Sequence, residues 1–360
     1  MRLVFLGLSI TSAWGNGHAT TYRGLCRALA ARGHDVVFYE WDAPWYAGKH
    51  RDLPPSACDY ADVRLFKQWS VARRELRREL LDADAVLLGS YFRPGIDAAD
   101  FLAQEFDGPR LFYDIDTPIT LRAYRDRGAA EYLRADQVPI FDVYFSFTGG
   151  PVLRELETRY GAPRARPLYC AVDPERHART PGRRAYRCAL GYMGTYAPDR
   201  QPTLERLLLE PARRRPGQDF VVAGPLYPAD LAWPDNVRRF EHVPPADHPA
   251  FYSSNRLTLN VTREEMRRWG WSPSVRIFEA AACGAAIVSD AWEGLDQFLE
   301  PAVEVLLPRS AEDVVAYLEL SDGEVRAVGE AARERILKSH TNDARAGALE
   351  GELDRLLQRA

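Results

Sequence analysis

The stretch GWSPSVRIFEAAACGAAIVSDAW, residues 270–292, carries the side chains best suited to bind a ligand. Arg276 and Glu279 are three residues apart, so on a helix they share one face, and Ser272 and Ser274 stand where that helix would begin. A carboxylate such as Glu279 suits two ribose hydroxyls, and an arginine with serines suits phosphate oxygens. The same spacing also fits an Arg–Glu pair that only stabilises its own helix. The pattern alone leaves both interpretations open.

A second candidate anion site surrounds Arg200 in GYMGTYAPDRQPTLERL, residues 191–207. This segment follows a strand, and Arg200 precedes a helix that Pro202 can begin. Loop amides, the helix dipole and one guanidinium could hold a diphosphate without a metal ion, although Arg200 could equally be a surface arginine. Weaker candidates are the strand-end residues Gly224 and Pro225 and, for the edge of a nucleobase, main-chain groups of His242 and Val243.

The first strand-to-helix loop, AWGNGHA, is rich in glycine, which lets a backbone approach a ligand closely at a helix N-terminus. We expect Gly15, Asn16 and Gly17 to line the binding cleft. His18 follows them, where a neutral imidazole could accept a proton from a hydroxyl or only cap the turn. The glycine spacing is not G-x-G-x-x-G, so NAD is not the predicted ligand.

Two carboxylates, Asp114 and Asp116, end the apolar run RLFYDID, and Pro118 stops the strand just after them. Either carboxylate could act as a general base or bind a substrate hydroxyl.

Short apolar runs alternate with helical patterns along the chain. The strands and helices that they predict must position these candidate residues. Residues 3–8, 85–91 and 110–116 are apolar on both faces, as parallel strands covered by helices are. The chain has 360 residues, more than one hydrophobic core usually serves. We therefore predict an α/β fold of two Rossmann-like domains facing across a cleft, with ligands at the carboxyl ends of the strands.

The domain boundaries follow from composition. Residues 160–187 are rich in proline and arginine and lack a periodic apolar pattern, which is typical of a linker. The predicted division is an N-terminal domain at 1–165, a linker at 166–187, a second domain at 188–340 and a C-terminal helix at 341–360. That helix either crosses back to the first domain or caps the second.

Composition narrows the class of protein. The sequence has 47 Lys and Arg against 51 Asp and Glu, a net charge of −4, so no global basic field favours nucleic acid as a partner. Five cysteines without a CxxC pair argue against a disulfide framework and a zinc site, and fit a reducing cytoplasm. The N-terminus lacks the features of a signal peptide, and no apolar run is long enough for a transmembrane segment.

Several segments together resemble GT-B glycosyltransferases of the "group 1" type, and most closely the spore-maturation-protein-like group. They are FEAAACGAAIVSD, VPPADHPAFY, LNVT, YCAVDPERH, GNGH and GHDVVFYE, so the resemblance spans nearly the whole chain. It implies transfer of a sugar from a nucleotide diphosphate sugar, bound by the second domain, to an acceptor hydroxyl held by the first. The acceptor could be a sugar, a glycan, a small molecule or a protein, and neither a metal ion nor another cofactor is expected.

Carried over by position, the resemblance implies that Glu279 binds the donor ribose and that Arg200 neutralises the diphosphate. Gly194 and Thr195 would lie along the phosphates. Retaining members carry a second Glu eight positions before the helix Glu, where this sequence has Trp271. This departure leaves the stereochemical course open: if the enzyme inverts, Asp116 or His18 is the expected base.

Three other interpretations compete with this one. The triplet DID at 114–116 matches the D-x-D pattern of metal-dependent, single-lobe glycosyltransferases, although a second Rossmann-like domain is not expected there. A nucleotide-sugar epimerase can use the same two-lobed fold. A catalytically inert, coat-associated nucleotide-binding protein is the third, and Trp271 is the hint for it.

Overall fold

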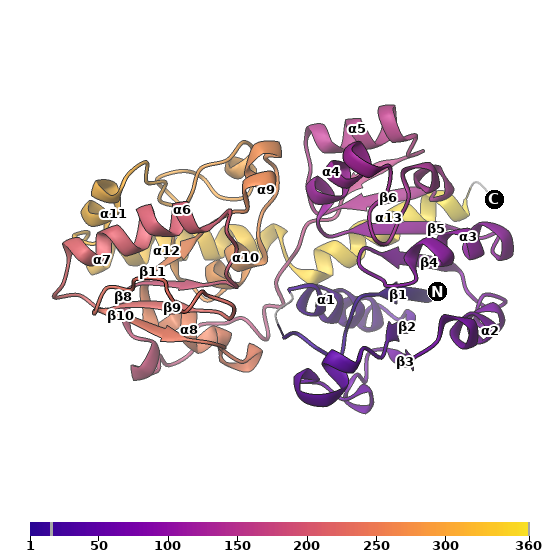
Figure 1. Ribbon diagram of the computed structural model, residues 1–360, viewed down its shortest axis with the longest axis horizontal. Helices are drawn as coiled ribbons and strands as arrows, with labels where there is room; N and C mark the ends of the chain where they lie inside the picture. The colour runs from indigo at the N-terminus through magenta and orange to yellow at the C-terminus, as the bar shows by residue number, and fades with distance from the viewer. Residues whose placement is uncertain (15–16, 359–360) are drawn as a thin grey trace. The chain divides into compact units, whose positions relative to one another are not determined.

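The computed structural model describes residues 1–14 and 17–358, which form two compact units (Figure 1). The first unit joins Met1–Tyr169 to the C-terminal segment that begins at Asn342, and the second is Cys170–Thr341. Each unit has its own parallel sheet.

The sheet of the first unit has the order β3-β2-β1-β4-β5-β6-β7, and every pairing is parallel. Central strands are buried on both faces because helices cover the sheet on both sides. The strands are β1 (Arg2–Gly7), β2 (Asp35–Trp41), β3 (Asp62–Phe66), β4 (Ala85–Gly89), β5 (Arg110–Asp114), β6 (Val143–Ser146) and β7 (Ala165–Pro167).

Helices connect these strands and one more returns from the end of the chain. The connecting helices are α1 (His18–Ala31), α2 (Trp69–Glu79), α3 (Gly95–Glu105), α4 (Thr117–Arg127) and α5 (Pro151–Tyr160). The C-terminal helix α13 (Asn342–Leu357) packs beside α1, where Glu350 accepts hydrogen bonds from Arg32 at 2.7 Å and pairs with His34 at 2.6 Å. The last helix therefore belongs to the core of the first unit.

The second unit has a smaller parallel sheet with the order β10-β9-β8-β11-β12. Its strands are β8 (Cys188–Met193), β9 (Phe220–Ala223), β10 (Val237–Phe240), β11 (Asn255–Asn260) and β12 (Ala286–Ser289). Its helices are α6 (Gln201–Leu204), α7 (Glu210–Arg214), α8 (His248–Ser254), α9 (Glu264–Trp269), α10 (Val275–Ala282), α11 (Ala311–Tyr317) and α12 (Asp322–Ser339). Buried leucines of the α6–α7 segment pack against valine and leucine side chains of β8, β9 and β11.

The structure differs from the sequence-based expectations mainly at sheet edges. Residues 166 and 167, expected in the linker, pair with β6 as part of β7, because the backbone of Phe145 and Ser146 offers an unpaired edge there. Edge strands β3 and β10 were not expected at all. Among the described residues, no helix is long and apolar enough to cross a membrane.

Candidate active site

The first unit brings candidate residues together where its strand order reverses. The chain runs outward from β1 to β2 and β3, then returns to β4 on the other side of β1. Ligands of such sheets bind at the carboxyl ends of the strands beside this reversal. His18 begins α1 after β1, Tyr91 follows β4, and Asp116 precedes α4 after β5. Three loops thus supply side chains to one edge of the sheet.

Asp116 is the centre of this group. The Tyr91 hydroxyl donates a hydrogen bond to Asp116 Oδ2 at 2.9 Å, and His18 Nε2 lies 4.0 Å from the same oxygen. The rings of His18 and Tyr91 meet edge to face at 5.2 Å. The Asp116 side chain keeps 21% of its exposure, so a ligand can still reach this carboxylate.

The surroundings of His18 favour its neutral form. Burial lowers the pKa of His18, and the charge of Asp116 opposes this shift only in part. The positive end of the α1 dipole also disfavours an imidazolium at this position. Nδ1 is buried without a hydrogen-bond partner among the described residues. A neutral imidazole beside a carboxylate is suited to accept a proton from a hydroxyl.

Asp114 differs from Asp116 because its side chain has no exposure at all. Its Oδ2 accepts a hydrogen bond from the Tyr144 hydroxyl at 2.6 Å, and its Oδ1 accepts one from the amide of Asp116 at 3.1 Å. Burial raises the pKa of Asp114 to about 6 in spite of these hydrogen bonds. Asp114 therefore fixes the turn that presents Asp116, and its own oxygen atoms are closed to a ligand.

A buried glutamate at the end of β2 shapes the loop that leads towards His18. Glu40 accepts hydrogen bonds from the amides of Ile10 and Thr11 at 2.6 and 3.0 Å, and from the hydroxyls of Ser9 and Thr11. Gly17 is the exposed N-cap of α1. The other two predicted loop residues, Gly15 and Asn16, lie outside the described residues.

The second unit also places candidate residues at a reversal of strand order, between β8 and β11. Arg276, in the first turn of α10, donates hydrogen bonds to the carbonyl of Met193 at 2.5 Å and to Asn260 Oδ1 at 2.7 Å. Its guanidinium also stacks 4.9 Å from the ring of Tyr192. Ser274, the N-cap of α10, donates to the same Asn260 oxygen at 2.7 Å.

The loop after β8 requires a glycine directly after the neighbouring strand β9. Gly224 has a φ of 148°, and a Cβ atom there would lie 2.0 Å from the carbonyl oxygen of Gly194. The carbonyl of Pro225 accepts a hydrogen bond from Tyr196 N at 3.0 Å, and the carbonyl of Thr195 accepts one from Arg200 at 3.3 Å. Arg200 and Arg276 therefore both bind the loop 193–195.

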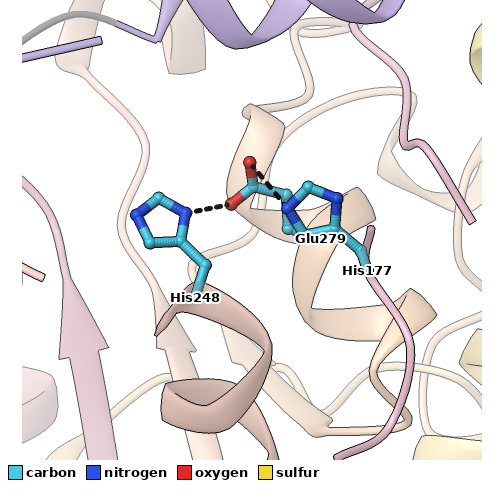
Figure 2. A group of neighbouring side chains, drawn as sticks. All are labelled: His177, His248 and Glu279. Atoms are coloured by element: carbon cyan, nitrogen blue, oxygen red, sulfur yellow. Dashed lines mark ion pairs between the residues drawn. The ribbon is translucent and has the colours of Figure 1, made fainter. Parts of the chain in front are cut away.

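Glu279 lies in the middle of α10, and two histidines face its carboxylate (Figure 2). His177 Nε2 is 3.5 Å from Oε1, and His248 Nδ1 is 3.4 Å from Oε2. The Tyr252 hydroxyl donates to Oε2 at 3.2 Å. Burial would raise the pKa of Glu279, but the positive field of His177 and the contacts with His248 and Tyr252 outweigh it and lower the pKa to about 2.

The same three side chains have the composition and spacing of a metal-ligand set. One ligand atom from each of His177, His248 and Glu279 lies within 4.8 Å of the other two. Ligands about 2.0–2.1 Å from a tetrahedral zinc stand about 3.3–3.4 Å apart, close to the two nitrogen–oxygen distances. His248 Nε2 also contacts the carbonyl of Val243 at 3.2 Å, a contact typical of metal-binding histidines. Contacts of the two imidazoles and the Tyr252 hydroxyl with an ionised Glu279 explain the same geometry without a metal.

The remaining predicted residues occupy different environments. Val243 is buried and its carbonyl is the one that His248 contacts, whereas His242 is exposed. Ser272 is buried, and its hydroxyl lies 3.2 Å from the sulfur of Met266. Trp271, at the position where retaining enzymes carry Glu, has a φ of 42° and its ring packs against Gly294.

Sequence reasoning missed several residues that complete these groups. His177 and His248 stood within the quoted segments YCAVDPERH and VPPADHPAFY, but nothing in their spacing pointed to Glu279. Tyr91 could have been found, because it directly follows the apolar run of β4 at the carboxyl end.

Two Rossmann-like units, each with its own parallel sheet, are the elements of the GT-B fold. Residues 200–351 match the family described as glycosyl transferase-like. No curated relative matches the chain by sequence.

Solved structures with this fold align over essentially the whole chain. Sucrose-phosphate synthase from Thermosynechococcus elongatus is 15% identical, with a TM-score of 0.71 and full coverage of both chains. HepE from Anabaena in complex with UDP-glucose is 12% identical, with a TM-score of 0.67, over 99% of this chain and 100% of HepE. An alpha-glucosyltransferase in complex with UDP is 11% identical, with a TM-score of 0.70, over 98% and 100% of the two chains. At these identities the likeness establishes the fold.

Proposed function

We propose that the chain is a glycosyltransferase that moves a sugar from a nucleotide diphosphate sugar to an acceptor hydroxyl, with no metal ion at the diphosphate. The second unit binds the donor, and the first unit holds the acceptor and the base. The neighbours solved with UDP or UDP-glucose make uridine nucleotides the first donors to test. The resemblance to the spore-maturation-protein-like group stays a prediction.

One observation carries the donor assignment. Arg200 and Arg276 both bind the loop 193–195, and within residues 1–14 and 17–358 neither forms an ion pair with a carboxylate. Arginines without an acidic partner at the carboxyl end of a sheet are suited to a diphosphate, whose charge increases when the glycosyl bond breaks. Guanidinium groups can neutralise this leaving group in place of a metal ion.

On the acceptor side, His18 is the proposed base for a transfer that inverts the anomeric centre. Its neutral imidazole accepts the proton of the acceptor hydroxyl, and Asp116 stabilises the imidazolium that forms. Tyr91 holds the Asp116 carboxylate by a hydrogen bond. Asp114 fixes the backbone of Asp116 from within the core. Both act as positioning residues.

Calorimetric titration with UDP and GDP tests the donor site. Arg200→Gln and Arg276→Gln should each weaken binding of the accepted nucleotide about 10- to 100-fold, since each loses a charged hydrogen bond. Arg213→Gln is the matched control, because Arg213 lies in the same unit, is half exposed and pairs with Glu205. Equal affinity in all three variants would overturn the donor assignment.

Product analysis tests the reaction itself. Wild-type protein incubated with the accepted nucleotide sugar and an acceptor panel should form a glycosylated acceptor. An epimerised donor sugar as sole product would establish an epimerase instead. Nucleotide binding without turnover of any donor would establish a binding protein.

A further inference from the structure

Three aromatic rings gather on the first unit outside the groups described above. Trp14 stacks on His50 with ring centroids 4.1 Å apart, and Trp45 meets Trp14 at 5.3 Å and His50 at 5.0 Å. We call Trp14, Trp45 and His50 the aromatic platform.

The platform is open to solvent on the side of Trp45. Trp45 is 60% exposed, more than any other Trp, Tyr or Phe among the described residues, whereas Trp14 and His50 are half-buried. A single exposed indole is unremarkable in a soluble protein, but an indole held against two further rings gives an extended apolar face that is typical of a binding surface.

Hydrogen bonds fix the two segments that carry the rings. The Ser12 hydroxyl donates to the carbonyl of His50 at 2.5 Å, and the amide of Ala13 donates to Asp52 Oδ1 at 2.7 Å. The amide of Leu53 donates to the carbonyl of Thr11 at 3.1 Å. The platform is therefore preorganised, so a ligand would not have to order it on binding.

The platform lies on the same edge of the sheet as His18. Trp14 belongs to the loop that follows β1 and leads to α1, and Trp45 and His50 lie in the segment after β2. Strands β1 and β2 are parallel neighbours, so their carboxyl ends lie side by side. A ligand on the platform is thus bound at the edge that carries the proposed base.

Two arginines beside the platform, among the side chains that the structure describes, each pair with an aspartate. Arg23 makes two hydrogen bonds to Asp52, at 2.9 and 3.0 Å, and Arg51 pairs with Asp42 at 2.6 Å. The Asp52 side chain keeps 37% of its exposure and can still accept a hydrogen bond from a ligand. Among the side chains that the structure describes, this border is polar and its charges are paired, which favours an uncharged, hydroxyl-bearing ligand over a phosphorylated one or a nucleic acid.

We propose that the aromatic platform binds a neutral sugar ring of the acceptor. The aliphatic C–H face of a pyranose packs on the electron-rich face of an indole, while its hydroxyls hydrogen-bond to the polar border. This inference rests on the proposed function and narrows the acceptor to neutral glycans or glycosides.

An array of neutral oligosaccharides, probed with the full chain in the absence of any donor, tests the proposal. We expect at least one glycan to bind, and calorimetry with that glycan to give about 10-fold weaker binding for Trp45→Ala. Trp45→Phe should recover part of the affinity, because a ring is restored. Leu81→Ala, which removes another exposed apolar side chain of the same unit, should bind as the wild type does.

Three outcomes would overturn the proposal. In the first, the protein binds no neutral glycan, and in the second, Trp45→Ala leaves glycan binding unchanged. In the third, Trp45→Ala only abolishes self-association, which would make the platform a contact between copies of this chain. Glycan binding that depends on Trp45, in a protein that turns over no donor, would sustain the platform and refute the glycosyltransferase. Turnover of a nucleotide sugar by a protein that binds no neutral glycan would sustain the glycosyltransferase and refute the platform.

Discussion

Asp114→Asn should stabilise the first unit at neutral pH, although Tyr144, Thr120 and the amide of Asp116 hydrogen-bond to the Asp114 carboxylate. Burial raises the pKa of this carboxyl from 3.8 to about 6, so the folded chain binds a proton there more tightly than the unfolded chain does. A difference of about 2 units corresponds to about 3 kcal/mol. The free energy of unfolding therefore falls by up to about 3 kcal/mol as the pH rises from about 4 to above 6.

An asparagine removes the charge and can keep the contacts with Asp116 and Tyr144. Its carbonyl oxygen can accept from the amide of Asp116, and its NH2 group can donate to the Tyr144 hydroxyl, which is both donor and acceptor. We expect Asp114→Asn to raise the stability at pH 7.5 by about 2–3 kcal/mol and to leave it nearly unchanged at pH 4. The decline in stability between these pH values should largely disappear.

Urea-dependent hydrogen exchange of peptides from β5 and β6 measures this stability for the first unit alone. Asp136→Asn serves as the control, because Asp136 is 73% exposed and pairs with Arg134 at the surface, where an ion pair contributes little. An Asp114→Asn variant that is equally destabilised at pH 4 and pH 7.5 would refute the reasoning. The hydrogen bonds would then outweigh the desolvation of the charge.

Three further results are expected. Gly224→Ala should destabilise the second unit by more than about 1 kcal/mol in urea unfolding and abolish nucleotide binding in calorimetry. Gly217→Ala is the control and should have neither effect, because a Cβ atom there meets nothing within 4 Å. His18→Gln should lower the transfer rate about 10²- to 10⁴-fold and leave the nucleotide affinity unchanged. In the wild type, the rate should fall only below about pH 6.5, because burial lowers the pKa of His18. Equilibrium dialysis against Zn²⁺ followed by elemental analysis should find no stoichiometric ion; one bound ion that is lost in His177→Ala would make Glu279 a metal ligand.

The sequence predicts the buried strands well and the more exposed edge strands β3 and β10 poorly, for a physical reason. The central strands β1, β4 and β9 are buried along almost their whole length, so each appears as an uninterrupted apolar run. The edge strands β3 and β10 consist mostly of exposed and partly buried residues and carry arginines, as in VRRF. A short run with charged residues does not stand out from a loop.

The candidate site was predictable only one element at a time. His18, Asp116 and Arg276 each stand at a strand end or a helix start, which a local pattern indicates. The burial of Asp114 two residues before an accessible Asp116, and the contact of His177 with Glu279, arise from packing between distant segments. No spacing within a single segment contains that information.

Strained backbone conformations occur at the carboxyl ends of both sheets, where the polar candidate residues also lie. Among the described residues, four that are not glycine have positive φ: Tyr91, Leu226, Trp271 and Ala302. Such conformations cost on the order of 1–3 kcal/mol each. Ala302 closes a tight turn by a hydrogen bond to Val305 at 2.8 Å, which accounts for it locally.

The other three lie beside the proposed binding sites. Tyr91 holds Asp116, Leu226 follows the segment of Gly224 and Pro225, and Trp271 precedes the serines at the start of α10. A glycine would relieve the strain at each position, but at Tyr91 it would also remove the hydroxyl that orients the carboxylate. The strained residues lie at the carboxyl ends of both sheets, so the geometry of the proposed binding sites explains them better than the stability of the fold does.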